Sequence, residues 1–322
     1  MYLRFGAALG ALGAGVAGIV VVIFLLSSEP GPTGLASSTT TPTVATVQPS
    51  SATLPGGRIA TPDAPGFPSP PPGAIVLARE AGDHALAIAV KPGLVRVSVL
   101  SPRGGGQRGM KVSLRFDGGA PVATKVCGAG CYQATSVKLT SPVSVDLDGT
   151  KYSFNLPAHT TSGTAVVANA TSTWKGLQSL VWHERLASSP TNAIHVVYKA
   201  VAPNSLSYEV NGLSSAVIIG GSRWDRPSPT AKWQRSSQDP QVRQPVPFWV
   251  LQTDARILGT AQVGGRSVWR VSFFDPVTPA WFEAYVDKQT SRTLELHMIA
   301  ASHFMDDVYG PFNSGLDLSP PH

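Results

Sequence analysis

The stretch WRVSFFDPVTPAWFEAYVDKQTSRTLEL, residues 269–296, decides the fold of the second half of this chain. It predicts three successive strands, at 267–275, 280–288 and 292–300, joined by a D-P-x-T-P connection and the turn KQTS. Trp269 and Phe273 fall on one side of the first strand, whereas Trp281 and Phe282 fall on opposite sides of the second. Aromatic residues on both faces indicate a sheet that is covered on both sides, by a thick core or around a concave apolar cavity.

The flanking sequence extends this sheet and adds one helix. The segment TSTWKGLQSLVWHERLAS, residues 171–188, predicts a helix because Trp174, Leu177 and Val181 share one helical face. The remaining runs of strand-forming residues lie at 193–201, 206–210, 215–220, 222–226, 231–235, 247–252 and 256–263. Residues 171–316 are therefore expected to form an α+β domain, with one long helix on a large antiparallel sheet, followed by a short tail at 317–322.

A second domain is predicted upstream, at residues 74–157. Seven short runs of strand-forming residues are separated there by glycine- and proline-containing turns. They lie at 74–78, 84–90, 94–100, 110–116, 131–139, 143–149 and 151–156. Seven strands at this spacing predict an immunoglobulin-like β-sandwich, joined to the α+β domain by a polar linker at 158–170. The sequence GGGQRG at 104–109 satisfies the G-x-G-x-x-G pattern, but a strand follows it, so no dinucleotide site is expected.

The amino-terminal region differs from both domains. Residues 5–26 carry no charge and are long enough to cross a bilayer as a helix, so 1–28 is predicted to be a membrane anchor or a cleaved signal. Arg4 on the short side places the amino terminus in the cytoplasm and the bulk of the chain outside. Residues 29–73, rich in Pro, Ser and Thr, predict a disordered spacer.

The segment KVCGAGCYQA, residues 125–134, contains the only two cysteines, Cys127 and Cys131. A metal clip or redox site would need a second ligand pair or a setting that activates a thiolate, and neither is visible. In an oxidising extracytoplasmic space, two cysteines separated by two glycines and an alanine predict a disulfide.

Two resemblances follow from these segments. The first domain, with VLARE at 76–80 and CGAGCYQA at 127–134, resembles the YtkA-like immunoglobulin-fold modules attached to copper-resistance proteins of the CopC/CopD type. The second, with residues 206–226 and 269–296, resembles the half-barrel of bacterial lipoprotein carriers of the LolA/LppX type. That resemblance implies a sheet wrapped around a helix and an apolar cavity. All seven tryptophans lie in this domain, and the cavity candidates are Trp174, Trp224, Trp249, Trp269, Phe273 and Trp281.

No hydrolase signature is present, so the chain is predicted not to be an enzyme. The only cofactor that the sequence suggests is copper, with His297, Met298, His303 and Met305 as candidate ligands. On a strand, however, His297 and Met298 point to opposite faces.

The net charge of +6 favours an anionic membrane or cell-wall surface, and a nucleic-acid partner is not expected outside the cell. The leading hypothesis is a membrane-anchored extracytoplasmic protein that binds an apolar ligand, such as a lipid or acyl chain, or a protein partner. A copper-handling accessory protein and a sensor or regulatory ectodomain are the alternatives.

Overall fold

The structure is a computed structural model that describes residues 53–54, 58–59, 68–277 and 279–322. The predicted anchor at 1–28 and most of the predicted spacer at 29–73 lie outside the described residues. Within the described part of the chain, no helix is long and apolar enough to cross a membrane. The described part is mainly β, as predicted, and its sheets are antiparallel throughout.

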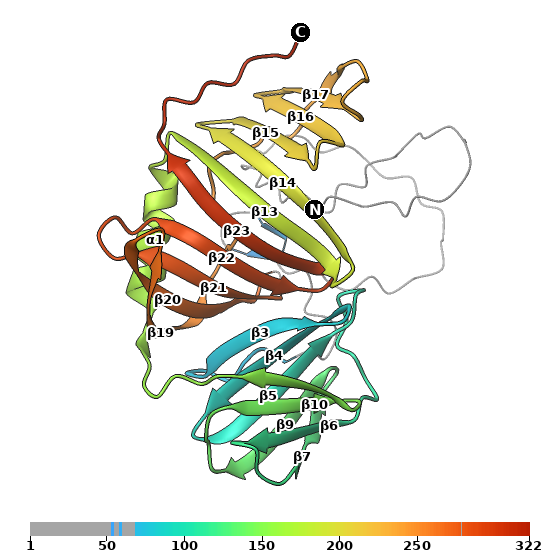
Figure 1. Ribbon diagram of the computed structural model, residues 1–322, viewed down its shortest axis with the longest axis vertical. Coiled ribbons are helices and arrows are strands. Elements are labelled where there is room, and N and C mark those ends of the chain that lie inside the picture. Colours follow the sequence, from blue (N-terminus) through green and yellow to red (C-terminus); the bar gives the residue numbers. More distant parts are fainter. Residues whose placement is uncertain (1–52, 55–57, 60–67, 278) are drawn as a thin grey trace, which may run out of the picture.

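The first domain is a sandwich of two sheets (Figure 1). One sheet has the order β3-β4-β5-β9-β8, with strands β3 (Ile75–Ala81), β4 (His84–Lys91), β5 (Gly93–Leu100), β9 (Cys131–Val137) and β8 (Lys125–Gly128). The other has the order β11-β10-β6-β7, with strands β11 (Thr150–Phe154), β10 (Val143–Leu147), β6 (Val112–Phe116) and β7 (Val122–Ala123). Side chains of both sheets, among them Ile88, Val97, Leu114 and Val145, form one buried core.

The seven strands predicted from sequence in this domain are all present, and β7 and β8 are short additions. The sandwich is therefore confirmed, while its immunoglobulin type stays a prediction. The segment 104–109 is a loop leading to strand β6, so the dinucleotide motif is excluded by its context. A separate pair of two-residue strands, β1 (Thr53–Leu54) and β2 (Arg58–Ile59), precedes the sandwich.

The second domain is a single sheet of twelve strands with the order β12-β19-β20-β21-β22-β23-β13-β14-β15-β16-β17-β18. The strands at one end are β12 (Thr161–Ser162), β19 (Thr253–Val263), β20 (Arg266–Asp275), β21 (Ala280–Asp287), β22 (Thr293–Ala300) and β23 (His303–Phe312). The others are β13 (Ser179–Ser189), β14 (Asn192–Val201), β15 (Ser205–Val210), β16 (Ser214–Ile219), β17 (Ser222–Arg226) and β18 (Gln234–Ser237). Helix α1 (Thr164–Lys175) packs on one face, which we call the inner face (Figure 1).

The connection between β18 and β19 requires this sheet to curl. The two strands lie near opposite ends of the sheet, yet only residues 238–252 join them, and these contain no helix or strand. In a flat sheet, ten strand spacings would separate them by about 48 Å. Fifteen residues reach that far only when fully extended, at about 50 Å. We call residues 238–252 the strap, because they run from one edge of the curled sheet to the other across its open side.

The predicted helix at 171–188 is wrong in its range. The helix covers Thr164–Lys175 and ends at Gly176, whose N–H donates to the Thr173 carbonyl, while the Leu177 N–H donates to the Trp174 carbonyl. Residues 179–189 form strand β13, which is paired on both sides, with β14 and β23. The hydrogen bonds that β13 forms with its two neighbouring strands stabilise the extended conformation, and the helical spacing of three apolar residues does not overcome this.

The segment 158–170, expected to be a linker, contributes β12 and the first half of α1, since TAVVANA is rich in residues that tolerate a helix.

The two domains pack directly against each other. The outer face of the large sheet, opposite α1, presents Phe274, Trp281 and Phe304 to small residues of β3 and β4, such as Val76 and Ala87. Hydrogen bonds to backbone groups of the first domain reinforce this contact at both ends. Gly73 donates its N–H to Asp254 Oδ1 at 2.7 Å, and Ser302 donates its hydroxyl to the Pro102 carbonyl at 2.8 Å.

Candidate functional site

The inner face of the large sheet holds an aromatic cluster where the resemblance to lipoprotein carriers implies a cavity. Trp174 of α1, Trp249 of the strap and Phe273 of β20 are all buried there. The Trp249 ring lies edge-on to Trp174, with centroids 6.5 Å apart, and edge-on to Phe273 at 5.4 Å. These three candidates are therefore brought together, and they fill the space between helix, strap and sheet with their own side chains.

The other three aromatic candidates lie elsewhere. Trp269 is half-buried at the margin of the same core, with the Lys288 ammonium 4.1 Å from its ring centroid. Trp281 is buried on the outer face, in the contact with the sandwich. Trp224 is half-buried on β17 and is not part of the apolar core. The sequence placed the aromatic candidates in this domain, but it could not show which of them lie on the inner face of the curled sheet and which on the outer face.

The strap is fixed to the domain at several points along its length. Asp275, itself buried, accepts hydrogen bonds from the backbone N–H groups of Val250 and Leu251 at 2.6 and 3.4 Å. Gln244 donates its N–H to the Pro203 carbonyl at 3.0 Å. Between these points, Phe248 and Trp249 turn inward against the core. The strap therefore closes the inner face chiefly with side chains rather than with a ladder of backbone hydrogen bonds.

The inner face also contains two buried acids. Glu184 of β13 and Asp307 of β23 are cross-strand neighbours, and each is less than a twentieth exposed. Tyr309 donates its hydroxyl to Asp307 Oδ2 at 2.6 Å. Burial raises the pKa of Glu184 to about 7, and burial together with the charge of Glu184 raises the pKa of Asp307 well above its usual range. The pair therefore retains at least one proton near neutral pH.

On the outer face, five polar residues form one row across adjacent strands. The register pairs Ser272 of β20 with Glu283 of β21, Glu283 with His297 of β22, His297 with Asp306 of β23, and Asp306 with Arg185 of β13. The neighbouring row on the same face is the apolar one that contacts the sandwich. The polar row therefore lies just beyond the apolar contact between the domains.

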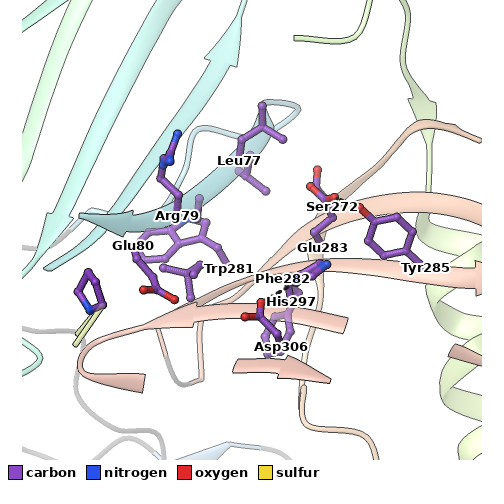
Figure 2. Close-up of a pocket in the computed structure, with 14 residues that line it drawn as sticks. Leu77, Arg79, Glu80, Ser272, Trp281, Phe282, Glu283, Tyr285, His297 and Asp306 are labelled. Atoms are coloured by element: carbon purple, nitrogen blue, oxygen red, sulfur yellow. Dashed lines mark hydrogen bonds and ion pairs between the residues drawn. The ribbon is translucent and has the colours of Figure 1, made fainter. Parts of the chain in front are cut away.

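A cleft of about 480 Å³ opens where this polar row meets strand β3 of the sandwich. Figure 2 shows Glu80 of β3 beside Trp281, with His297 and Asp306 below them. Residues of both domains line the cleft, including Leu77, Glu80, Trp281, Glu283, His297 and Asp306. Arg185 joins the two sides, because its Nη1 lies 2.8 Å from Glu80 Oε1 and 3.1 Å from Asp306 Oδ2.

The charges around the cleft are matched to one another. Asp306 Oδ1 lies 2.7 Å from His297 Nδ1, and this hydrogen bond raises the pKa of His297 above its ordinary value. Burial favours the neutral form of Glu283, but hydrogen bonds from Arg270 and Tyr285 outweigh it, so its pKa is lowered. Each of the three carboxylates in the cleft thus already has a cationic partner. The cleft therefore joins the two domains with a polar network of paired charges.

The four candidate copper ligands are divided between two faces of the sheet. Met298 and Met305 are cross-strand partners, buried on the inner face. His297 lies on the outer face and is bonded to Asp306. Burial lowers the pKa of His303 to about 4. In the described part of the chain, no group of three or more His, Cys, Asp or Glu side chains is placed to hold a metal ion.

The disulfide between Cys127 and Cys131 is confirmed. It closes the turn between β8 and β9, where Gly130 adopts a φ of +64°. A side chain at Gly130 would also collide with the carbonyl of Val99 and the backbone of Gly106. The bridge and the glycine together fix this turn against the loop that follows β5.

Several residues of the site were not singled out from sequence. Glu80 is not in a predicted run, Glu283 is the only acid before Asp287 in its run, and Asp306 lies next to Asp307 beyond the last predicted strand. Only the strand register shows that Glu283 and Asp306 flank His297. The strap was also missed, because PFWVLQ at 247–252 was expected to be a strand. Its three prolines, at 240, 245 and 247, were the available signal, since each lacks the N–H that an interior strand needs.

The fold and site define a two-domain β protein in which a sandwich is packed against a curled sheet closed by a helix and a strap. No family model matches the sequence, and no curated protein matches it. Among solved structures, LprF from Mycobacterium bovis is 8% identical with a TM-score of 0.36, and the match covers 49% of this chain and 96% of that one. A LolA superfamily protein from Nitrosomonas europaea is 8% identical, with a TM-score of 0.26 and the same two coverages.

An uncharacterized conserved protein from Thermus thermophilus is 12% identical with a TM-score of 0.30, and the match covers 46% of this chain and 86% of that one. TM-scores this low carry no argument about a ligand. The function is therefore argued from the residues of this chain.

Proposed function

We propose that this chain is a membrane-tethered extracytoplasmic binding protein that holds an apolar ligand, such as a lipid or acyl chain, on the inner face of its curled sheet. In the closed form described above, the strap occupies that face. The observation that carries the proposal is the position of Trp249, a buried aromatic side chain supplied by a segment without regular structure.

The strap has the properties of a segment that can open. Loops longer than about 12–15 residues without secondary structure are uncommon in compact domains, and many of them are lids or binding loops. Few backbone hydrogen bonds would have to break, because the backbone N–H groups of the strap are held by the Gly221 carbonyl at one end, the Pro203 carbonyl in the middle and Asp275 near the other end. Opening would expose a continuous apolar surface that includes Phe273, Phe282 and Met298. An acyl chain would cover this surface in place of Phe248 and Trp249.

The location of the protein is part of the same proposal. The uncharged segment 5–26 would tether the chain, and the disulfide in the sandwich favours an oxidising compartment. A ligand taken from a membrane would then be within reach of the domain.

A catalytic role is not part of the proposal. The outer-face row does contain a serine, a histidine and an aspartate, but Glu283 stands between Ser272 and His297 in the strand register. A serine nucleophile needs its base within hydrogen-bond reach, and this order separates them. We therefore propose a binding protein rather than a hydrolase.

Native mass spectrometry of residues 68–322, which contain both described cores, tests the proposal. Wild-type protein, Trp249→Ala and the outer-face control Trp224→Ala would be mixed with a fatty acid and examined for bound species. We expect one ligand per chain for wild type and for Trp224→Ala, and tighter binding for Trp249→Ala because the competing side chain is gone. Absence of bound fatty acid from all three proteins would reject the proposal.

A further inference from the structure

The last two strands of the large sheet, β17 and β18, form a hairpin that stands away from the apolar core. β18 is the edge strand, all four of its residues are exposed, and no residue of β17 is buried. Figure 1 places β17 at the end of the molecule opposite the sandwich. Trp224 on β17 and Trp233 just before β18 nevertheless give this outlying hairpin two large aromatic side chains.

The two indole rings are covered by arginine side chains. The Arg235 guanidinium carbon lies 5.6 Å from the centroid of Trp224, and the Arg226 carbon lies 4.8 Å from the centroid of Trp233. Neither tryptophan belongs to the hydrophobic core. Both are half-buried, so part of each ring remains accessible to a partner.

The hairpin is also the most cationic part of the domain. Residues 222–235 contain four cations and one acid, a net charge of +3, which is half of the +6 of the whole chain. Asp225 is occupied by Arg223, whose Nε donates to Asp225 Oδ2 at 2.8 Å. In the described part of the chain, no acidic side chain forms an ion pair with Arg226, Lys232 or Arg235. Three unneutralised cations thus lie beside two half-exposed tryptophans.

We propose that this hairpin, residues 222–237, docks the protein onto an anionic lipid surface. Tryptophan is enriched at the boundary between headgroups and acyl chains, because its ring is apolar and its N–H is polar. Lysine and arginine near the surface are attracted by the negative potential of anionic lipids. The combination fits a bilayer interface better than a soluble polyanion, which would use the cations and leave the indoles without an apolar environment. This inference does not depend on the apolar ligand proposed above.

Docking is tested by tryptophan quenching in vesicles with brominated acyl chains. The full chain would be reconstituted in brominated phosphatidylcholine alone and in an equal mixture of brominated phosphatidylcholine and phosphatidylglycerol. The predicted anchor contains no tryptophan, since all seven lie at position 174 or later, so quenching reports only on the second domain. We expect quenching in the anionic vesicles at low salt, and its loss at high salt and in the neutral vesicles.

Three variants make the result specific to the hairpin. Arg226→Gln/Arg235→Gln is expected to abolish the quenching, whereas Arg108→Gln/Lys125→Gln, which removes two exposed cations from the sandwich, is expected to leave it unchanged. Trp224→Phe/Trp233→Phe is expected to remove the quenched emission while the buried tryptophans remain. Equal quenching in neutral vesicles, or quenching that survives in Trp224→Phe/Trp233→Phe, would overturn the proposal. So would a shift of tryptophan emission on adding soluble polyphosphate without any quenching by lipid.

Discussion

Trp249 donates its indole N–H to the hydroxyl of Thr171 at 2.9 Å, and this bond joins the strap to helix α1. Strap and helix therefore form one cover over the inner face of the curled sheet. The bond is partly buried, and because the Trp249 side chain is buried, its indole N–H depends on Thr171 for a partner while the cover stays closed.

Replacement of Trp249 should destabilise the domain strongly. Trp249→Ala removes a ring that is 4% exposed, and large-to-small changes of this kind cost about 3–5 kcal/mol. Trp224→Ala, on the half-buried outer hairpin, should cost less than about 1.5 kcal/mol. Urea denaturation followed by circular dichroism measures both. Similar losses for the two variants would show that Trp249 is not a main element of the inner core.

The buried acids should make stability depend on pH. The pKa of Glu184 is about 7 in the folded state, against an ordinary value of 4.5, so the unfolded chain loses this proton first as the pH rises. The free energy of unfolding should therefore fall between about pH 4.5 and pH 7, by on the order of 3 kcal/mol from Glu184, and the raised pKa of Asp307 adds a further decline in the same direction. Glu184→Gln cannot ionise at this position, so its decline should be shallower, with only the contribution of Asp307 remaining.

Thermal unfolding of wild type and Glu184→Gln from pH 5 to pH 8 provides the measurement. The two melting temperatures should diverge as the pH rises, with the variant the more stable above neutrality. If the melting temperatures of the two proteins changed with pH by the same amount over that range, a raised pKa of Glu184 would be contradicted. Glu209→Gln, which removes an exposed acid of β15, serves as a control that leaves the inner pair intact.

His297 should titrate above its ordinary range because Asp306 holds its Nδ1. A raised histidine pKa stabilises the folded state fully below about pH 6.5, and the contribution is lost as the pH rises through the folded pKa. Asp306→Asn removes the acceptor charge, so the pKa of His297 should fall towards or below its ordinary value. NMR titration of the imidazole protons measures this shift directly, and an unchanged pKa in the variant would exclude the Asp306 contact as its cause.

The disulfide should make a small contribution to stability, because the loop it closes is short. On the chain-entropy model, a bridge between Cys127 and Cys131 contributes about 2 kcal/mol. Cys127→Ser/Cys131→Ser should lower the free energy of unfolding by that amount without disturbing the second domain. Near-ultraviolet circular dichroism, dominated by the tryptophans of the second domain, should stay unchanged while the unfolding midpoint falls.

Most strands were predictable because they depend on local alternation, although β13 was expected to be helical and β23 lies beyond the last predicted strand. The run Met110–Phe116 alternates apolar and polar side chains, and β6 lies within it. The helix was misplaced because Trp174, Leu177 and Val181 have helical spacing across a boundary that Gly176 creates. A glycine directly after a lysine in the last turn is a typical helix end, so this signal was present in the sequence.

The arrangement of the site was not predictable from local patterns. The row from Ser272 to Arg185 exists only when five strands take one particular register, and that register is set by distant pairing. Closure of the inner face by Trp249 likewise depends on the strap crossing between two sheet edges that are far apart in the strand order. Sequence alone left the choice between a filled core and an open cavity undecided.

Photo-crosslinking tests the central claim most directly. The full chain, in membranes, would be exposed to a fatty acid carrying a diazirine on its acyl chain, irradiated and digested, and the labelled peptides would be mapped by mass spectrometry. An apolar ligand on the inner face predicts saturable labelling of β20, β21 and the strap, around Phe273, Phe282 and Trp249, which unlabelled fatty acid competes away. Labelling confined to residues 5–26, with none in the second domain, would contradict it.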